Sequence, residues 1–248
     1  MSRIVLLALC LQGAGDVEKS LRLVGDVSAP LLDREAAVKA LAQTKAGGRA
    51  LLALVDQDRF PEELKATARF ALAASPDAEV RAEGDRKLPV PKSKGGTPVP
   101  PIAKLLEMKG DAAAGAKVYR DPKGPNCIAC HQIGDEGKLV GPPLTTIGNK
   151  LARELLFETI LTPSAALLMG YENWIVRTKS GDIKTGIKVE DADDHVTLKD
   201  AQGEFIDIPR EKIEQMKQLK LSMMPEDITK TMTIQDLVDV VEYLTRQK

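Results

Sequence analysis

The chain has 248 residues, 43% of them hydrophobic and 29% charged, so it is long enough for one large domain or two smaller ones. Its net charge of −1, from 35 basic and 36 acidic residues, argues against a nucleic acid or an anionic membrane as its partner. Aromatic residues make up only 3% of the chain, so any core has to consist mainly of Leu, Val, Ile and Ala.

The first fifteen residues have the layout of a secretory signal. Arg3 supplies a positive charge, residues 4–11 form a short apolar run, and small residues follow at 13–15. An ordinary amphipathic N-terminal segment is the alternative. No other apolar run approaches the roughly 20 residues of a membrane-spanning helix. We therefore expect a signal peptide over 1–15 and a mature protein that is soluble, periplasmic or otherwise exported, with no transmembrane segment.

Residues 16–87 are predicted to form a helical domain. Helices are expected over 34–43 with Asp33 as N-cap, over 50–55 after a break at Gly47-Gly48, over 62–74, and in a short segment after Pro76-Asp77. Amphipathic helices of this length with short breaks resemble a small stack of HEAT-like pairs. Such a stack is either a docking surface for a partner or a packing module without one.

The segment 88–101, LPVPKSKGGTPVPP, is predicted to be a linker between two domains. Its five prolines and two glycines cannot continue a helix. The second domain is expected over 102–248, with helices over 102–109, 112–119 and 150–161. A final helix, capped by Thr233, is expected to run to about Arg246.

The pentapeptide Cys127-Ile128-Ala129-Cys130-His131 reads C-x-x-C-H, the attachment sequence for haem of the c type. Two thiols at this spacing can each form a thioether with one vinyl group of the same porphyrin, and the histidine then binds the iron. A chance C-x-x-C, a thioredoxin-like redox pair and half of a zinc site are the alternatives. A redox pair needs no following histidine, and the chain has no second Cys/His cluster for zinc. The remaining cysteine, Cys10, falls in the predicted signal. We expect one covalent haem c on Cys127 and Cys130, with His131 as an iron ligand.

Residues 172–215 carry the pattern of a small antiparallel sheet. Apolar and polar residues alternate over 183–189, which predicts a half-buried strand. Short runs at 174–178, 195–199 and 205–208 are similar, and turn residues separate them. The sheet would shield the haem or dock a partner, or it is an insertion with only a minor core of its own.

Several pieces in order along the chain resemble a class I c-type cytochrome: GDAAAGAKVY, C-x-x-C-H, GPPL, and MP before a final helix that ends in VVEYL. More narrowly, residues 102–248 resemble the haem-binding domain described from planctomycete and verrucomicrobial proteins. That pattern is matched by Gly141-Pro142, Pro163-Ser164 and Gly170-Tyr171. The resemblance implies a mainly α protein: a HEAT-like helical domain, then a cytochrome c-like helical domain carrying the small inserted sheet. In that fold Gly115 and Tyr119 would cross Tyr243 and Leu244.

The resemblance also implies which residues complete the iron site. The sixth ligand belongs in the loop before the last helix, which contains Met223 and Met224, and Met224 is favoured because a proline follows it. Met223 is the second choice, and both could simply fill the core. The carbonyl of Pro142, or less readily of Pro143, would accept a hydrogen bond from the free ring nitrogen of His131. His195, the other histidine, is expected at an exposed strand end.

Two strong axial ligands suit an electron carrier, whereas an open position suits binding of a gas or turnover of peroxide. The first hypothesis is an exported mono-haem cytochrome that carries single electrons, is not itself an enzyme, and serves a redox partner such as a periplasmic dehydrogenase or oxidase. The alternatives are a five-coordinate haem c protein acting as a peroxidase or gas sensor, and a HEAT-type interaction module with an accessory haem domain.

Overall fold

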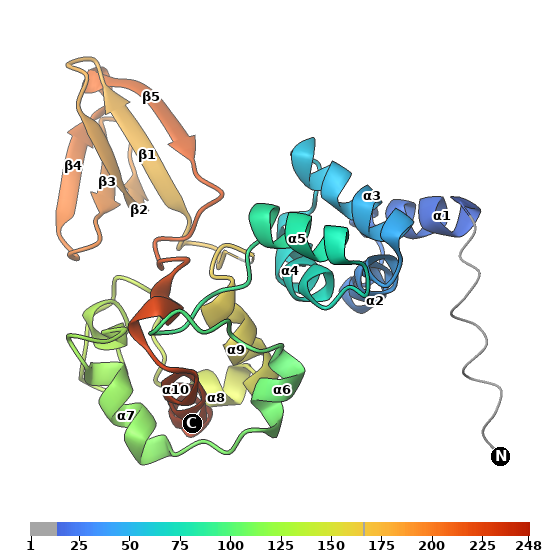
Figure 1. Cartoon of the computed structure of the whole chain (residues 1–248). Helices are drawn as coiled ribbons and strands as arrows, with labels where there is room; N and C mark the ends of the chain where they lie inside the picture. The colour runs from blue at the N-terminus through green and yellow to red at the C-terminus, as the bar shows by residue number, and fades with distance from the viewer. Residues whose placement is uncertain (1–13, 166) are drawn as a thin grey trace. The chain divides into compact units, whose positions relative to one another are not determined.

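A computed structural model describes residues 14–165 and 167–248. The predicted signal peptide, residues 1–15, lies almost wholly outside these described residues. The chain divides into two compact units, Met1–Val90 and Pro91–Lys248 (Figure 1). The described residues form mainly helices and one small antiparallel sheet, as the sequence predicts.

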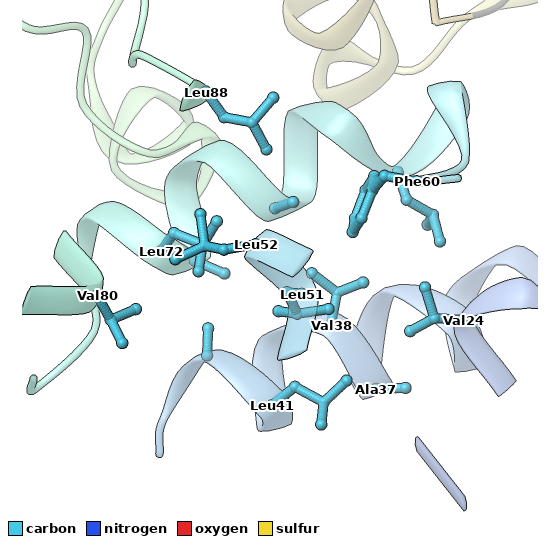
Figure 2. Packing of buried hydrophobic residues seen from close by; sticks show 14 residues of the cluster. Val24, Ala37, Val38, Leu41, Leu51, Leu52, Phe60, Leu72, Val80 and Leu88 are labelled. Carbon is cyan, nitrogen blue, oxygen red and sulfur yellow. The ribbon is translucent and has the colours of Figure 1, made fainter. Parts of the chain in front are cut away.

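The first unit consists of short helices packed around an aliphatic core. Its elements are α1 (Ala14–Gly25), α2 (Leu31–Ala42), α3 (Lys45–Asp56), η1 (Glu62–Leu64), α4 (Lys65–Ala73) and α5 (Ala78–Lys87). Figure 2 shows how Leu41, Leu51, Leu52 and Leu72 from three of these helices meet in the core. Because the chain has few aromatic residues, branched aliphatic side chains of similar size fill this core. Phe60 is the one aromatic residue in the cluster.

One expectation for this unit is wrong: Gly47-Gly48 does not break the chain. Both glycines lie buried inside α3, which begins at Lys45 behind the N-cap Thr44. A Cβ at Gly47 would fall 2.3 Å from the carbonyl oxygen of Leu41, and one at Gly48 would fall 2.5 Å from Val80 Cγ1. The pair therefore allows close helix packing, which is glycine's other common use. Similarly, Asp33 lies inside the first turn of α2 rather than at its N-cap, which is Pro30.

Of the elements in the described residues, the second unit contains the remaining helices and the five strands. Its helices are α6 (Ile102–Glu107), α7 (Ala112–Arg120), η2 (Cys127–Ala129), α8 (Ile147–Lys150), α9 (Arg153–Leu161), η3 (Arg210–Lys212), η4 (Ile228–Thr231) and α10 (Ile234–Thr245). Thr233 caps α10 in a reciprocal capping box with Asp236. Asp111 caps α7 by accepting from the amides of Ala113 and Ala114.

From Pro91 onward, the Pro-rich segment before α6 packs within the second unit. Lys92 and Pro98 form an isolated antiparallel bridge, and Val99 is only 2% exposed. The amide of Lys94 donates to the carbonyl of Met232, and Thr229 Oγ1 donates to the carbonyl of Lys92. Proline and glycine exclude a helix here but leave an extended strap free to pack. Leu88, in the same predicted linker, belongs to the core of the first unit.

Helices α7 and α10 cross at close range, as expected from the resemblance. A Cβ on Gly115 would lie 1.9 Å from the carbonyl oxygen of Asp239 and 2.8 Å from Tyr243 Cβ, so only glycine fits. The carboxylate of Asp239 accepts from the amide of Asp111 at 2.8 Å and ties the start of α7 to α10. Tyr119 and Tyr243 pack with ring centroids 5.7 Å apart.

The sheet has the strand order β4-β3-β2-β1-β5, with all neighbouring strands antiparallel. Its strands are β1 (Asn173–Thr178), β2 (Ile183–Asp191), β3 (His195–Lys199), β4 (Phe205–Pro209) and β5 (Ile213–Gln218). Four of them match the predicted runs. The sequence missed β5, and it overstated the burial of β2. Ile187 is buried, but Ile183 is 61% exposed at the hairpin end, and Val189 is 43% exposed where the β2–β3 register shifts.

Within the described ranges, no helix combines the length and the apolar character needed to cross a bilayer.

Candidate functional site

The two cysteines of the C-x-x-C-H motif lie on one tight turn. Asn126 adopts the left-handed conformation at φ 48°, which asparagine tolerates better than most residues, and turns the chain into η2. The amides of Cys130 and His131 both donate to the carbonyl of Cys127, at 3.1 and 2.9 Å. Both thiols are free and partly buried. The turn therefore presents two thiols and an imidazole from five consecutive residues.

A loop eleven residues further along fixes the His131 ring. Nδ1 lies 2.8 Å from the carbonyl oxygen of Pro142. A carbonyl can only accept, so Nδ1 carries the hydrogen and Nε2 keeps its lone pair for a metal. Gly141 packs flat against the ring: a Cβ there would lie 2.5 Å from Cε1. The pKa of His131 is lowered mainly by burial, and the bond to Pro142 opposes that shift.

The backbone of the motif is held from two further directions. The hydroxyl of Tyr119, which is fully buried on α7, donates to the carbonyl of His131 at 2.6 Å. Burial raises the pKa of Tyr119, so the hydroxyl keeps its proton. The carbonyl of Cys130 accepts from the amides of Val140 and Gly141 at 3.0 and 2.7 Å. These bonds join α7 and the 138–142 loop to the motif.

These residues fit a covalently attached haem better than a redox dithiol. Burial raises the pKa of both thiols, that of Cys127 to about 12, whereas reactive redox cysteines have lowered pKa values. The His131 ring is oriented through Nδ1, the usual arrangement for a histidine that binds a metal through its other nitrogen. Among the described residues, no cluster of three or more His, Cys, Asp or Glu could hold a metal ion.

The methionines of the predicted distal loop are both partly buried, in the irregular segment before η4. The amide of Met224 donates to Ser222 Oγ at 3.1 Å, and the amide of Ser222 donates to Ser164 Oγ at 3.0 Å. Ser164 is 6% exposed and follows α9. Two serine hydroxyls thus link the backbone of the methionine loop to a buried point 58 residues earlier in the chain.

His195, considered from the sequence, and Arg153 lie in different surroundings. His195 is partly exposed at the start of β3, with Nδ1 2.7 Å from Asp194 Oδ1. Arg153 donates to the carbonyls of Leu106 and Met108 at 2.9 Å, where it satisfies the C-terminal end of α6. Its guanidinium is therefore committed to helix capping.

A comparison with protein-family models finds the cytochrome c family over residues 112–198. The match covers about a third of the chain, from the start of α7 through the C-x-x-C-H motif to β3, and ends before Met223 and Met224. It supports a c-type cytochrome, that is, a haem c electron-transfer protein. Cytochromes c carry covalently attached haem c with its iron, so the match assigns this cofactor. A comparison with curated proteins found no match.

Sequence reasoning missed several residues that position the motif. Tyr119 was expected only at the helix crossing, yet its hydroxyl also reaches the His131 carbonyl. The Ser164–Ser222 link had a partial signal in the Pro163-Ser164 pair, but nothing in the sequence joins that pair to Ser222. The contacts that the sheet makes with residues 138–140, described below, left no sequence signal.

Proposed function

We propose that the protein is an exported mono-haem c-type cytochrome that carries single electrons, with His131 and Met224 as axial ligands of the iron. The observation that carries the proposal is the C-x-x-C-H turn, in which the Pro142 carbonyl holds the His131 ring through Nδ1 and leaves Nε2 available. One such motif stands in the sequence, in agreement with one haem per chain.

When bound, haem c supplies an iron that alternates between the ferrous and ferric states and so accepts or releases one electron at a time. Cys127 and Cys130 would hold the group covalently. His131 would hold the iron from one side, and its N–H bond to Pro142 would increase the basicity of the imidazole. A second strong ligand would leave no open position for oxygen or peroxide.

Met224 is proposed for that second position. Pro225 stiffens the loop after it, and the link through Ser222 to Ser164 ties the loop to the buried end of α9. A thioether ligand opposite histidine raises the reduction potential. Met223 is the alternative in the same loop. Met232, by contrast, is 2% exposed and fills the core.

The location and partners follow from the chemistry of attachment. Cytochrome c domains are typically exported, and the N-terminal sequence has a charged residue followed by an apolar run. A redox protein such as a periplasmic dehydrogenase or oxidase would donate or accept the electron. The helical first unit is proposed to be HEAT-like, because its short amphipathic helices pack in sequence around one aliphatic core.

The experiment is to make the full chain in a host that attaches haem c, and to record its pyridine haemochrome and redox spectra. The proposal predicts one haem per chain, retained under denaturing conditions, and low-spin spectra in both oxidation states. The matched control replaces Cys127 and Cys130 with Ser and should lose the covalently retained haem. A high-spin ferric spectrum in the unchanged protein would contradict the electron carrier and support the five-coordinate alternative.

A further inference from the structure

The turn between β3 and β4 is a rigid hairpin end. One carboxylate oxygen of Asp200 accepts from the amides of Gln202 and Glu204, at 2.9 and 2.8 Å. The amide of Gly203 donates to the carbonyl of Asp200, and Gly203 adopts φ +87°, a region that favours glycine. The turn is therefore fixed by its own hydrogen bonds as well as by the pairing of the two strands.

This turn contacts the loop segment Lys138–Val140 through two reciprocal lysine bonds. Lys138 Nζ donates to the carbonyl of Gln202 at 2.8 Å, and Lys199 Nζ donates to the carbonyl of Leu139 at 2.9 Å. Each side of the contact thus supplies one ammonium donor and one backbone acceptor. In the sequence, Lys138 and Gln202 are 64 positions apart, and Lys199 and Leu139 are 60 positions apart.

An apolar contact lies beside the lysine bonds. A Cβ placed on Gly203 would come within 3.3 Å of Val140 Cγ2, so the glycine backbone lies directly against that side chain. Val140 is only 3% exposed although it belongs to a loop. The sheet therefore touches this loop with hydrogen bonds and with a packed surface.

The loop segment Lys138–Val140, which the turn contacts, leads directly into the residues that hold the His131 ring. Val140 and Gly141 donate their amides to the carbonyl of Cys130, and the next residue, Pro142, accepts from His131 Nδ1. Lys138 adds a fourth bond, from its amide to the carbonyl of Ile128. A displacement of residues 138–140 would be transmitted to the Pro142 carbonyl through two intervening peptide units.

We propose that the inserted sheet is a clamp for the proximal ligand, with Lys138, Lys199 and Gly203 as positioning residues. They hold the 138–142 loop so that Pro142 keeps its hydrogen bond to His131. This bond strengthens the imidazole as a donor and stabilises the ferric iron, so the clamp sets the reduction potential. The inference rests on the proposed function, because it requires haem iron at His131.

The test replaces both lysines at once, Lys138→Met with Lys199→Met, in the haem-loaded full chain. Methionine keeps the length of the stem and removes the donor. We expect faster amide hydrogen exchange at Val140 and Gly141. We also expect a reduction potential above that of the control variant, which likewise loses a positive charge, because the bond from His131 Nδ1 to Pro142 weakens. The control is Lys217→Met, an exposed lysine of β5, which β1 and β2 separate from β3 and its turn.

The conservative pair Lys138→Arg with Lys199→Arg keeps donors at both positions and should restore both measurements toward those of the unchanged protein. Lys199→Met alone gives the same comparison with less disturbance, should the double variant fold poorly. Amide exchange and a reduction potential identical to those of Lys217→Met would overturn the clamp. The proposed function fails by a different result, a high-spin or haem-free unchanged protein, so the two failures can be told apart.

Discussion

The two sides of the proposed iron site are held in different ways. The proximal side is contiguous: Cys127 to Pro142 are sixteen successive residues in which the motif, its turn and its ring acceptor bond to one another. The distal side depends on a loop more than ninety residues further along, tied back through Ser222 to Ser164. The proximal ligand, which its own neighbours hold with support from the β3–β4 turn, should withstand a single substitution better than the distal loop, for which the contact between Ser222 and Ser164 is the described tie.

The largest effect is expected on the proximal side, for Gly141→Ala. Its Cβ would meet three atoms of the His131 ring at 2.5 to 3.0 Å, so the ring or the loop has to move. Overpacking of this kind costs about 2–3 kcal/mol of unfolding free energy. Denaturant unfolding followed by visible circular dichroism of the haem measures it. Gly25→Ala, where a Cβ meets nothing within 4 Å, is the control. Equal stability of the two variants would contradict the packing described.

The next effect is expected for Tyr119→Phe, which removes the hydroxyl that donates to the His131 carbonyl. A buried acceptor left without its donor costs about 1–2 kcal/mol. The ring contact with Tyr243 should remain, because phenylalanine keeps the aromatic surface. The same unfolding assay applies, and Tyr243→Phe is a matched control on the facing helix. A loss no greater than that of the control would show that the hydroxyl does not support the motif.

The distal side should respond less in stability and more in ligand exchange. Ser164→Ala removes the acceptor of the Ser222 amide and should cost about 1 kcal/mol. If the ligand-bound loop is destabilised by this amount, added imidazole should displace the methionine at about a fivefold lower concentration. Ser180→Ala, in the exposed turn between β1 and β2, is the control. Unchanged imidazole affinity in Ser164→Ala would mean that the loop is held by other contacts.

The smallest expected effect is the pH dependence of stability that His195 contributes. The pKa values of the two histidines shift in opposite directions. The pKa of His131 is lowered by burial, whereas that of His195 is raised above 6.5 mainly by its hydrogen bond to Asp194, with Glu190 and Asp207 adding to it. The stabilisation from His195 is fully present below about pH 6.5 and is lost as the pH rises through the raised folded value. In Asp194→Asn, a nuclear magnetic resonance titration should show the pKa of His195 falling. No change would contradict the pairing.

The sequence predicted the local parts of the molecule well and the long-range parts poorly. The C-x-x-C-H motif, the cap at Thr233 and four of the strands depend on neighbouring residues. Strand β5, IEQMKQ, was missed because its two partly buried side chains, Ile213 and Met216, do not alternate with period two. Gly47-Gly48 was misjudged because a glycine pair suits both a break and close packing, and only the positions of Leu41 and Val80 decide between them.

The site shows the same division. The bond between Pro142 and His131, eleven positions apart, was expected only from the resemblance to a c-type cytochrome. The bonds from Ser222 to Ser164 and from the β3–β4 turn to residues 138–140 join segments about sixty positions apart, and single serines, lysines and glycines carry no pattern that identifies such partners. These contacts follow from the fold as a whole, which a single sequence does not specify residue by residue.

The central claim is the pair of axial ligands, and the most direct test compares Met224→Ala with Met223→Ala in the haem-loaded protein. The account predicts that Met224→Ala loses the near-infrared charge-transfer band between sulfur and ferric iron. Its reduction potential should fall by on the order of 0.1 V, a part of the ~0.8 V range that axial ligands span. Met223→Ala should keep both the band and the potential. A Met224→Ala protein whose ferric spectrum stays low-spin and unchanged would contradict the account.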